Sequence, residues 1–167
     1  MLDEKELITI RLEYDLYDRL TSWEDKLSGI RILDNLYEIT VPIVKLFNLF
    51  NITEYDTPFS IVDELYVKSP RDSWIQVLNL YKKKDGKLKL MFCKGRSLIC
   101  GKKHTMQTLD GVHYSVHAKD VYNIESRNFE TIENFIRVED GDVFGIVIPA
   151  PYLYVTANGF THRSPKA

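Results

Sequence analysis

Two histidines and one serine are the residues of this chain whose types and positions best suit chemistry. His104 follows an apolar run and the short step Gly101-Lys102-Lys103, and His162 lies two residues before Ser164. A histidine can exchange a proton near neutral pH, and a serine hydroxyl becomes a nucleophile when a neighbouring group activates it. The three residues therefore indicate attack by a hydroxyl with the help of positioned imidazoles.

Other interpretations of the histidines stay open on this basis. Taken alone, His104 fits a structural histidine at a strand end better than a catalytic one. His162 is more telling, because a histidine beside Thr161 and so near the end of the sequence has little core to satisfy it. His113 and His117 share one face of a predicted strand, but no third ligand lies near them in the sequence, so we predict no metal site.

The composition favours one domain without a charged binding surface. The chain has 167 residues, 44% of them hydrophobic, which is enough for one full core. A net charge of -2 and a pI near 6.1 provide no general attraction to nucleic acid or to a membrane surface. The basic run Lys82-Lys83-Lys84 is followed by Asp85-Gly86, which predicts a solvated hairpin tip.

The cysteines and the hydropathy indicate an ordinary cytoplasmic protein. Cys93 and Cys100 lack a CxxC spacing and lie in apolar runs, so we predict that both are core residues. Residues 2–6 are mostly charged where a signal peptide would be apolar. The longest apolar stretch, Ile39 to Phe50, is interrupted by Pro42 and is too short to span a bilayer.

The first third of the chain is predicted to be largely helical. Leu7 to Leu12 alternate apolar and polar residues, which predicts one strand. Apolar residues between Tyr14 and Leu27 recur at helical spacing, and Gly29 is a suitable stop. Asp34 suits the cap of a second helical segment that reaches Phe50, and Pro42 inside it predicts a kink or a break.

The remainder is predicted to be antiparallel β-sheet. Short runs rich in β-branched and aromatic residues are bounded by Pro, Asp, Gly or Ser; they cover residues 60–68, 73–81, 87–93, 97–100, 111–116, 143–148 and 152–156. The stretch 118–136 is predicted to be loop-like to helical. The fold class is therefore mainly β, with a helical portion near the N-terminus.

A series of short motifs in a fixed order suggests a known family. It comprises Gly95, Leu98-Ile99, Gly101-x-x-His104, Thr108-Leu109-Asp110-Gly111 and Ala118-Lys119-Asp120-Val121, then Val143-Phe144-Gly145-Ile146-x-Ile148 and the segment Tyr154 to His162. In this order and spacing the chain resembles the inteins, the self-splicing members of the Hint superfamily. The resemblance covers roughly residues 60 to 164 and implies a β horseshoe with a helical insertion near the N-terminus.

The resemblance implies a role for each of the three residues. His104 would bond to the N-terminal scissile peptide and promote an acyl shift onto a Cys or Ser side chain. His162 would polarise the C-terminal scissile carbonyl while the following Asn cyclises, and Ser164 would receive the N-terminal segment by transesterification. The process is autocatalytic, with a single turnover, and needs no metal or organic cofactor.

The sequence departs from the family in three ways. It begins Met1-Leu2-Asp3 where a Cys or Ser block is expected, it has Arg163 in place of the terminal Asn, and it has Gly145 where Asp or Cys is usual. The block that contains Gly145 also lacks its usual histidine near Tyr152. The first departure predicts the C-terminal fragment of an atypically split intein that splices in trans. Its partner would be a short N-terminal intein fragment carrying the Cys or Ser nucleophile.

The resemblance also implies how the chain is divided. Residues 1–167 would form a single Hint-like splicing domain, with a helical insert at 14–58 and a remnant of the downstream flanking segment, the C-extein, at 164–167. The gap between Val121 and Val138 is too short for a homing endonuclease, which predicts a mini-intein. The alternatives are an inactive Hint-like binding or structural module, which Arg163 and Gly145 favour, and a small phage-type β structural protein.

Overall fold

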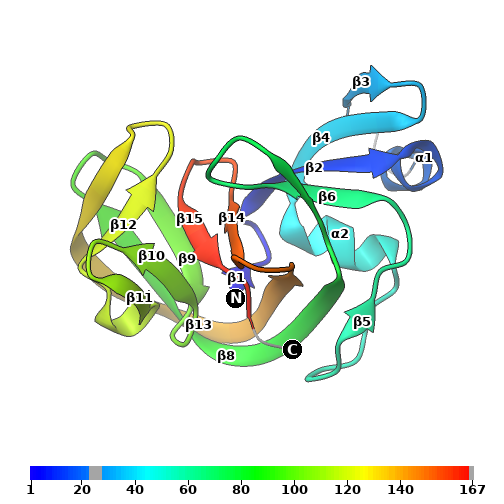
Figure 1. The fold of residues 1–167 in the computed structure, drawn as a ribbon. Coiled ribbons are helices and arrows are strands. Elements are labelled where there is room, and N and C mark those ends of the chain that lie inside the picture. The colour runs from blue at the N-terminus through cyan, green and yellow to red at the C-terminus, as the bar shows by residue number, and fades with distance from the viewer. Residues whose placement is uncertain (23–27, 166–167) are drawn as a thin grey trace.

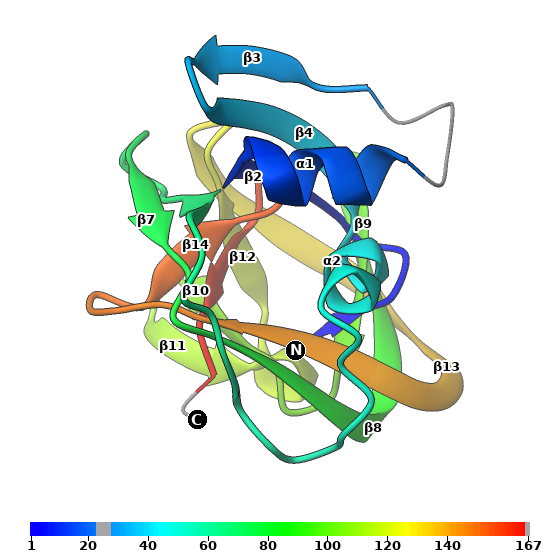
Figure 2. The ribbon, with the colours of Figure 1, turned by 90° about the vertical axis from the view of Figure 1, so that its right-hand side faces the viewer.

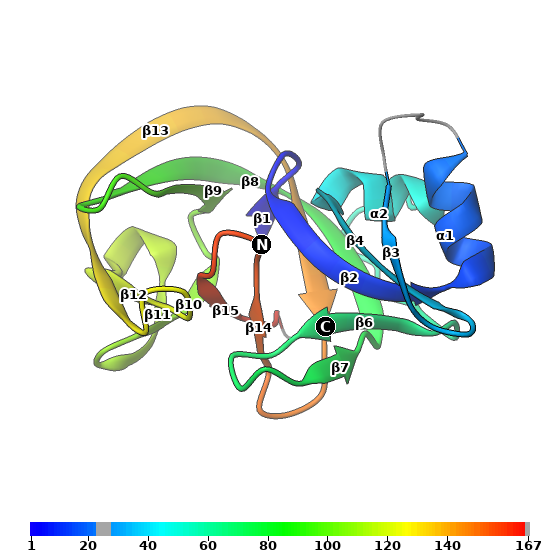
Figure 3. The same cartoon turned by 90° about the horizontal axis from the view of Figure 1, so that it is seen from above.

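Two long, curved strands form the frame of the fold. A computed structural model describes residues 1–22 and 28–165. In it β8 (Asn79–Phe92) pairs antiparallel with β13 (Asn128–Val147), from Asn79 opposite Val147 to Phe92 opposite Ile132. Two register shifts, at 132/134 and at 138/141, interrupt the pairing, and such bulges bend a strand and increase its twist. In Figure 3 the two strands form one curved band, and the N-terminus lies on its inner side.

The first strand of the chain lies inside this frame. The sheet order is β12-β13-β1-β9-β8-β5, and β8 also pairs with β13. The shorter members are β1 (Leu2–Asp3), β5 (Phe59–Ser60), β9 (Ser97–Gly101) and β12 (Asp120–Asn123). Leu2 is fully buried and faces Phe144 of β13 on one side and Cys100 of β9 on the other. Residue 1 is therefore held at the centre of the molecule (Figure 1).

Two smaller sheets flank the frame. One has the order β3-β4-β2-β6-β7, formed by β3 (Ile30–Leu33), β4 (Leu36–Pro42), β2 (Leu7–Glu13), β6 (Leu65–Lys68) and β7 (Trp74–Gln76). The other has the order β11-β10-β15-β14, formed by β11 (Gly111–Tyr114), β10 (Thr105–Thr108), β15 (Thr161–Arg163) and β14 (Leu153–Val155). A single 3₁₀ turn, η1 (Ser115–His117), follows β11. The predicted mainly β fold class is confirmed.

The two α-helices of the described residues belong to the predicted helical portion. The helix α1 (Tyr14–Thr21) and the helix α2 (Ile43–Leu49) contact each other beside the sheet that contains β2 and β4 (Figure 2). The predicted first helix extends further, but its part from Trp23 to Leu27 lies outside the described residues. No helix in the described ranges is long and apolar enough to cross a bilayer.

The prediction of a helix between Asp34 and Val41 is wrong. This segment forms β4, in which Ile39 and Val41 are buried and Thr40 between them is exposed. The β-branched residues favour a strand, and the pairing with β2 overrides the helical spacing of the apolar positions. Pro42 ends the strand and α2 starts directly after it, so the predicted break at this proline is confirmed. The segment 14–58 is therefore part strand and part helix.

Two further predictions of local structure are wrong. Asp85-Gly86 does not form a hairpin tip, because β8 continues through it and Asp85 pairs with Gly141 of β13. The stretch 118–136 is not loop-like, since β12 and the first half of β13 occupy it. Within β13, Glu130 is a charged residue at a buried position, so the strand lacks a regular apolar alternation. Its carboxylate is buried and forms an ion pair with Arg96 at 2.8 Å.

A buried ion pair anchors the first strand. The Asp3 carboxylate accepts a hydrogen bond from the Lys87 ammonium at 2.6 Å, and each residue is only 7% exposed. Removing one partner of a buried pair leaves the other charge without compensation. The charged residues that follow Leu2 are therefore compatible with a buried strand.

We expect Asp3→Ala to lower the free energy of unfolding by about 3 to 5 kcal/mol, because it leaves the buried Lys87 ammonium unpaired. Urea denaturation followed by circular dichroism measures the change. Asp34→Ala is the matched control, because it removes a solvent-exposed ion pair with Arg31 and should shift the midpoint little. The double variant Asp3→Ala/Lys87→Met should recover part of the loss. Equal midpoints for Asp3→Ala and Asp34→Ala would contradict this account.

Candidate functional site

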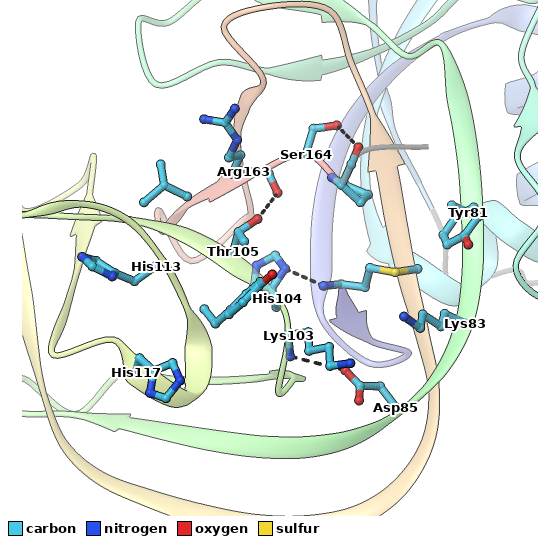
Figure 4. Close-up of a pocket in the computed structure, with 14 residues that line it drawn as sticks. Tyr81, Lys83, Asp85, Lys103, His104, Thr105, His113, His117, Arg163 and Ser164 are labelled. Carbon is cyan, nitrogen blue, oxygen red and sulfur yellow. Dashed lines mark hydrogen bonds between the residues drawn. The ribbon is translucent and has the colours of Figure 1, made fainter.

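The candidate site is a cavity of about 700 Å³ at the meeting point of the first and last described residues. Its lining includes Met1, His104 and Thr105 on one side and Arg163, Ser164 and Pro165 on the other. Figure 4 shows His104 and Thr105, at the start of β10, and Arg163 and Ser164, at the end of β15, among the side chains around the cavity. Two of the three predicted site residues, His104 and Ser164, line this cavity.

His104 lies against the nitrogen of residue 1. The Met1 nitrogen and His104 Nδ1 are 2.6 Å apart, and a dashed line marks this contact in Figure 4. A tight turn positions the imidazole, since the His104 amide donates to the Gly101 carbonyl at 3.0 Å and the His104 carbonyl accepts from the Ser115 amide at 2.7 Å. The Ser115 hydroxyl also donates to the Gly101 carbonyl at 2.6 Å. The turn is thus fixed from both sides.

His162 lies behind His104 and does not line the cavity. It belongs to β15, between β10 and β14, and is fully buried. Its Nδ1 is 2.8 Å from His104 Nε2, and its Nε2 is 2.9 Å from the Thr156 hydroxyl. Both ring nitrogens are therefore engaged, and the two predicted histidines form a buried pair.

Burial keeps both imidazoles neutral. Desolvation, and secondarily the N-terminal amine and His162, hold the pKa of His104 well below its ordinary value. Burial also lowers the pKa of His162 to about 3 and that of the Met1 amine to about 5. An uncharged imidazole can accept a proton at one nitrogen while it donates from the other.

The last described residues lie on the opposite side of the cavity. The Ser164 hydroxyl accepts a hydrogen bond from the Ile148 amide at 3.1 Å and donates to the Pro165 carbonyl at 3.2 Å. The Arg163 carbonyl accepts from the Thr105 hydroxyl at 3.4 Å. The bond between Arg163 and Ser164 is thus held by β10 and by the end of β13.

Gly145 of β13 lies between the two ends. A Cβ added at this position would come 2.8 Å from Pro165 Cγ and 3.1 Å from Met1 Cγ. Real Cβ atoms do not approach other heavy atoms that closely, so the Met1 and Pro165 side chains occupy the space that a larger residue at 145 would need. This packing explains why glycine occurs where the sequence resemblance leads one to expect Asp or Cys.

The remaining histidines and cysteines have more ordinary surroundings. His113 and His117 line the rim of the cavity and are exposed, and no group of three or more His, Cys, Asp or Glu in the described ranges could hold a metal ion. Cys100 is buried as predicted, and burial raises the pKa of its thiol to about 12. Cys93 is exposed, so its prediction as a core residue is wrong.

Sequence reasoning missed several residues of the site. Met1, Ser115 and Thr156 contact a predicted site residue, and Thr105 donates to the Arg163 carbonyl. None of the four was selected as a site residue, although Thr156 lies within the motif segment Tyr154 to His162. Thr156 had a usable signal, because it lies only six positions before His162 and precedes the turn Asn158-Gly159. Met1 had none, since no local pattern links it to a histidine 103 positions away.

We expect the unfolding free energy to fall as the pH drops below about 6.5. A histidine with a pKa of about 3 in the fold and about 6.5 in the unfolded chain binds its proton only after unfolding in that window, which favours the unfolded state. Glu6 opposes this trend between about pH 4.5 and 7, because burial raises its pKa to about 7.

Comparing variants isolates the contribution of His162. His162→Gln should make the decline between pH 6.5 and 4.5 shallower by up to about 1.4 kcal/mol per pH unit. His113→Gln is the control, because His113 is exposed. Urea denaturation at several pH values measures the slopes. Parallel profiles for the native chain and His162→Gln would show that the imidazole is not buried in its neutral form.

Comparison with known proteins gives a consistent result at the level of the fold. No family model and no curated protein matches the sequence. Solved structures do match. The gp41-1 intein aligns with a TM-score of 0.62 at 17% identity, over 98% of this chain and 97% of that one. The VidaL intein aligns with a TM-score of 0.69 at 12% identity, over 99% and 97%.

A third solved structure also matches. The DnaB intein from Synechocystis sp. PCC 6803 aligns with a TM-score of 0.59 at 14% identity, over 99% of this chain and 98% of that one. In all three matches the alignment extends over nearly the whole length of each protein. The chain therefore has the fold of the inteins, as its sequence motifs predicted.

Proposed function

We propose that this chain has the site of a protein-splicing element, which acts on its own flanking segments in a single turnover once position 1 carries a Cys or Ser and position 163 an Asn. One observation carries the proposal: residue 1 and the Ser164-Pro165 segment meet at Gly145, within one cavity. Splicing joins two flanking segments and removes what lies between them, so both junctions must reach the same reactive groups. Proximity of this kind converts a bimolecular step into a unimolecular one.

The N-terminal junction would react at His104. When a residue precedes Met1, the Met1 nitrogen becomes the amide of the scissile peptide, and it lies 2.6 Å from His104 Nδ1. An acyl shift needs a thiol or hydroxyl on residue 1 that attacks the preceding carbonyl. The thioether of Met1 has no proton to lose and yields no stable acyl product. As the sequence stands, this step therefore lacks its nucleophile.

The C-terminal junction would lie between Arg163 and Ser164. Ser164 is the proposed acceptor, because it lines the same cavity as Met1. The Thr105 hydroxyl donates to the carbonyl of Arg163, so we assign the polarisation of this carbonyl to Thr105. His162, for which the resemblance implied that role, has both nitrogens bonded elsewhere. Residues 164 onward are proposed to belong to the downstream flanking segment.

Arg163 is unsuited to the final step of splicing, which is cyclisation of the residue before the C-terminal junction. Cyclisation requires a side-chain amide that attacks its own backbone carbonyl, and a guanidinium has no such five-membered route. Together with Met1, Arg163 favours the alternative of an inactive Hint-like binding or structural module. The two proposals differ in one respect that can be measured, since only the first becomes reactive when side chains at these positions are replaced.

Splicing in trans is the second form of the proposal. The sequence predicted that a separate N-terminal fragment supplies the missing strand. In the structure, however, Leu2 and Asp3 already fill the position between β9 and β13. A fragment from another chain would have to displace them. We therefore favour a reaction at position 1 of this chain, with a Cys or Ser there in place of Met1, within the predicted cytoplasmic setting.

The test uses a fusion in which a reporter domain precedes position 1. Met1→Cys should make the junction cleavable by an added thiol, with release of the reporter seen as a mass change, because His104 already contacts the scissile nitrogen. The native Met1 fusion should stay intact under the same conditions. His104→Ala in the Met1→Cys background should slow cleavage on the order of 100-fold or more.

The outcomes separate the alternatives. Cleavage of the Met1→Cys fusion without any added fragment supports the proposal and the assignment of the nucleophile to position 1. Cleavage only after an N-terminal fragment with its own Cys or Ser is added supports the trans form. A folded Met1→Cys fusion that resists thiol in both experiments contradicts the splicing proposal and leaves the inactive module.

A further inference from the structure

We infer that His162, Thr156 and Asn158 form a one-way chain of hydrogen bonds that fixes the tautomer of His104. They are thereby positioning residues for the N-terminal step. The inference rests on the proposed function and gives His162 a role at the N-terminal junction, through His104, in place of contact with the C-terminal carbonyl. Four hydrogen bonds link the Met1 nitrogen to Asn158.

The Met1 nitrogen sets the direction of the hydrogen-bond chain. In a chain with a preceding residue, the Met1 nitrogen is an amide and can only donate. His104 Nδ1, 2.6 Å away, must then accept, so the ring proton is on Nε2. That proton is donated to His162 Nδ1 at 2.8 Å, which places the His162 proton on Nε2. His162 Nε2 in turn donates to the Thr156 hydroxyl oxygen at 2.9 Å.

The opposite end imposes the same direction independently. Asn158 Oδ1 lies 2.6 Å from the Thr156 hydroxyl, which must therefore donate to it and accept from His162 Nε2. An amide oxygen can only accept. The Asn158 amide is oriented by further contacts, as its Nδ2 donates to the Ser97 carbonyl at 3.4 Å and its Oδ1 accepts from the Phe160 amide at 3.5 Å. Every group of the chain is satisfied in one arrangement of protons.

The backbone fixes the Thr156–Asn158 end of the hydrogen-bond chain. Thr156 and Asn158 flank a turn closed by the Gly159 amide, which donates to the Thr156 carbonyl at 3.0 Å. Gly159 has a φ of +91°, and a Cβ there would lie 2.5 Å from Asn123 Oδ1. Only glycine fits such a position. Thr156 is 3% exposed, so water does not compete for its hydroxyl.

This arrangement suits the acyl shift. With a cysteine at position 1, the S–H proton passes to His104 Nδ1, the sulfur attacks the preceding carbonyl, and the proton moves on to the leaving nitrogen as the C–N bond breaks. The net change is one C–S bond formed, one C–N bond broken, and one proton moved from sulfur to nitrogen. The intermediate imidazolium keeps donating from Nε2 to His162, which stabilises it and holds the ring in place, as an orienting partner does for a catalytic histidine.

The test combines kinetics with a spectroscopic measurement. In the Met1→Cys fusion, Thr156→Val removes the hydroxyl at nearly constant volume and should slow thiol cleavage at least about tenfold. Thr156→Ser keeps the hydroxyl and should restore a rate close to that of the parent. His162→Gln should slow cleavage about 100-fold. Thr40→Val is the matched control, because it removes a hydroxyl that is hydrogen-bonded to Thr9 on an exposed strand, and it should leave the rate unchanged.

The spectroscopic measurement does not depend on activity. The ¹⁵N chemical shifts of His104, in the unreactive Met1 chain with a preceding residue, should show Nδ1 unprotonated and Nε2 protonated. Thr156→Val should convert this pattern to a mixture of tautomers, while Thr156→Ser and Thr40→Val should preserve it. Circular dichroism verifies that each variant is folded.

The outcomes distinguish the inference from the function on which it rests. A Met1→Cys parent that cleaves neither alone nor with an added N-terminal fragment overturns the proposed function, and the His104 shifts then decide the hydrogen-bond chain on their own. An active parent whose rate and His104 tautomer are unchanged by Thr156→Val overturns the inference. A slower rate in Thr156→Val with an unchanged tautomer also overturns it, because the hydroxyl would then act by another route.

Discussion

The site depends on the placement of β1. Two residues, Leu2 and Asp3, hold the start of the chain between β9 and β13, one by complete burial and the other by its ion pair with Lys87. This short strand puts the nitrogen of residue 1 on His104 and its side chain on Gly145. The curvature of β8 and β13 makes room for it, and the last residues then approach the same point from the other side.

The site is polar but carries little charge, and this follows from its burial. His104 and His162 are almost inaccessible to water, and a charged imidazole would be costly in such surroundings. A buried network of neutral groups is stable only when every donor and acceptor is satisfied. The series from Met1 to Asn158 meets that condition, so its geometry serves both the stability of the fold and the proposed chemistry.

The sequence predicted the parts of the fold that rest on local pattern. The strands 7–12, 97–100 and 143–148 were recognisable from alternation and turn residues, and the ordered motifs identified the fold class along with His104. The sequence could not show that 36–41 is a strand, because the pairing of β4 with β2 decides it. It also could not show that Leu2-Asp3 is buried, since the partner of Asp3 lies 84 positions away.

The candidate site was predictable to a similar extent. His104, His162 and Ser164 were selected from their spacing, and the structure brings His104 and His162 into contact. The partners of each residue come from distant strands, and the role of His162 at the C-terminal junction was implied only by the resemblance to inteins. In the structure its two ring nitrogens bond to His104 and to Thr156, and a role at His104 is proposed for it.

The central claim is that the two junctions react with each other in this one cavity. The most direct measurement uses a chain that carries Met1→Cys and Arg163→Asn between two reporter segments, analysed by mass spectrometry after folding. We expect a product in which the two reporters are joined and the chain between them is excised. Ser164→Ala in the same chain should permit cleavage but no joining. A folded double variant that yields neither joined nor cleaved reporters would contradict the account.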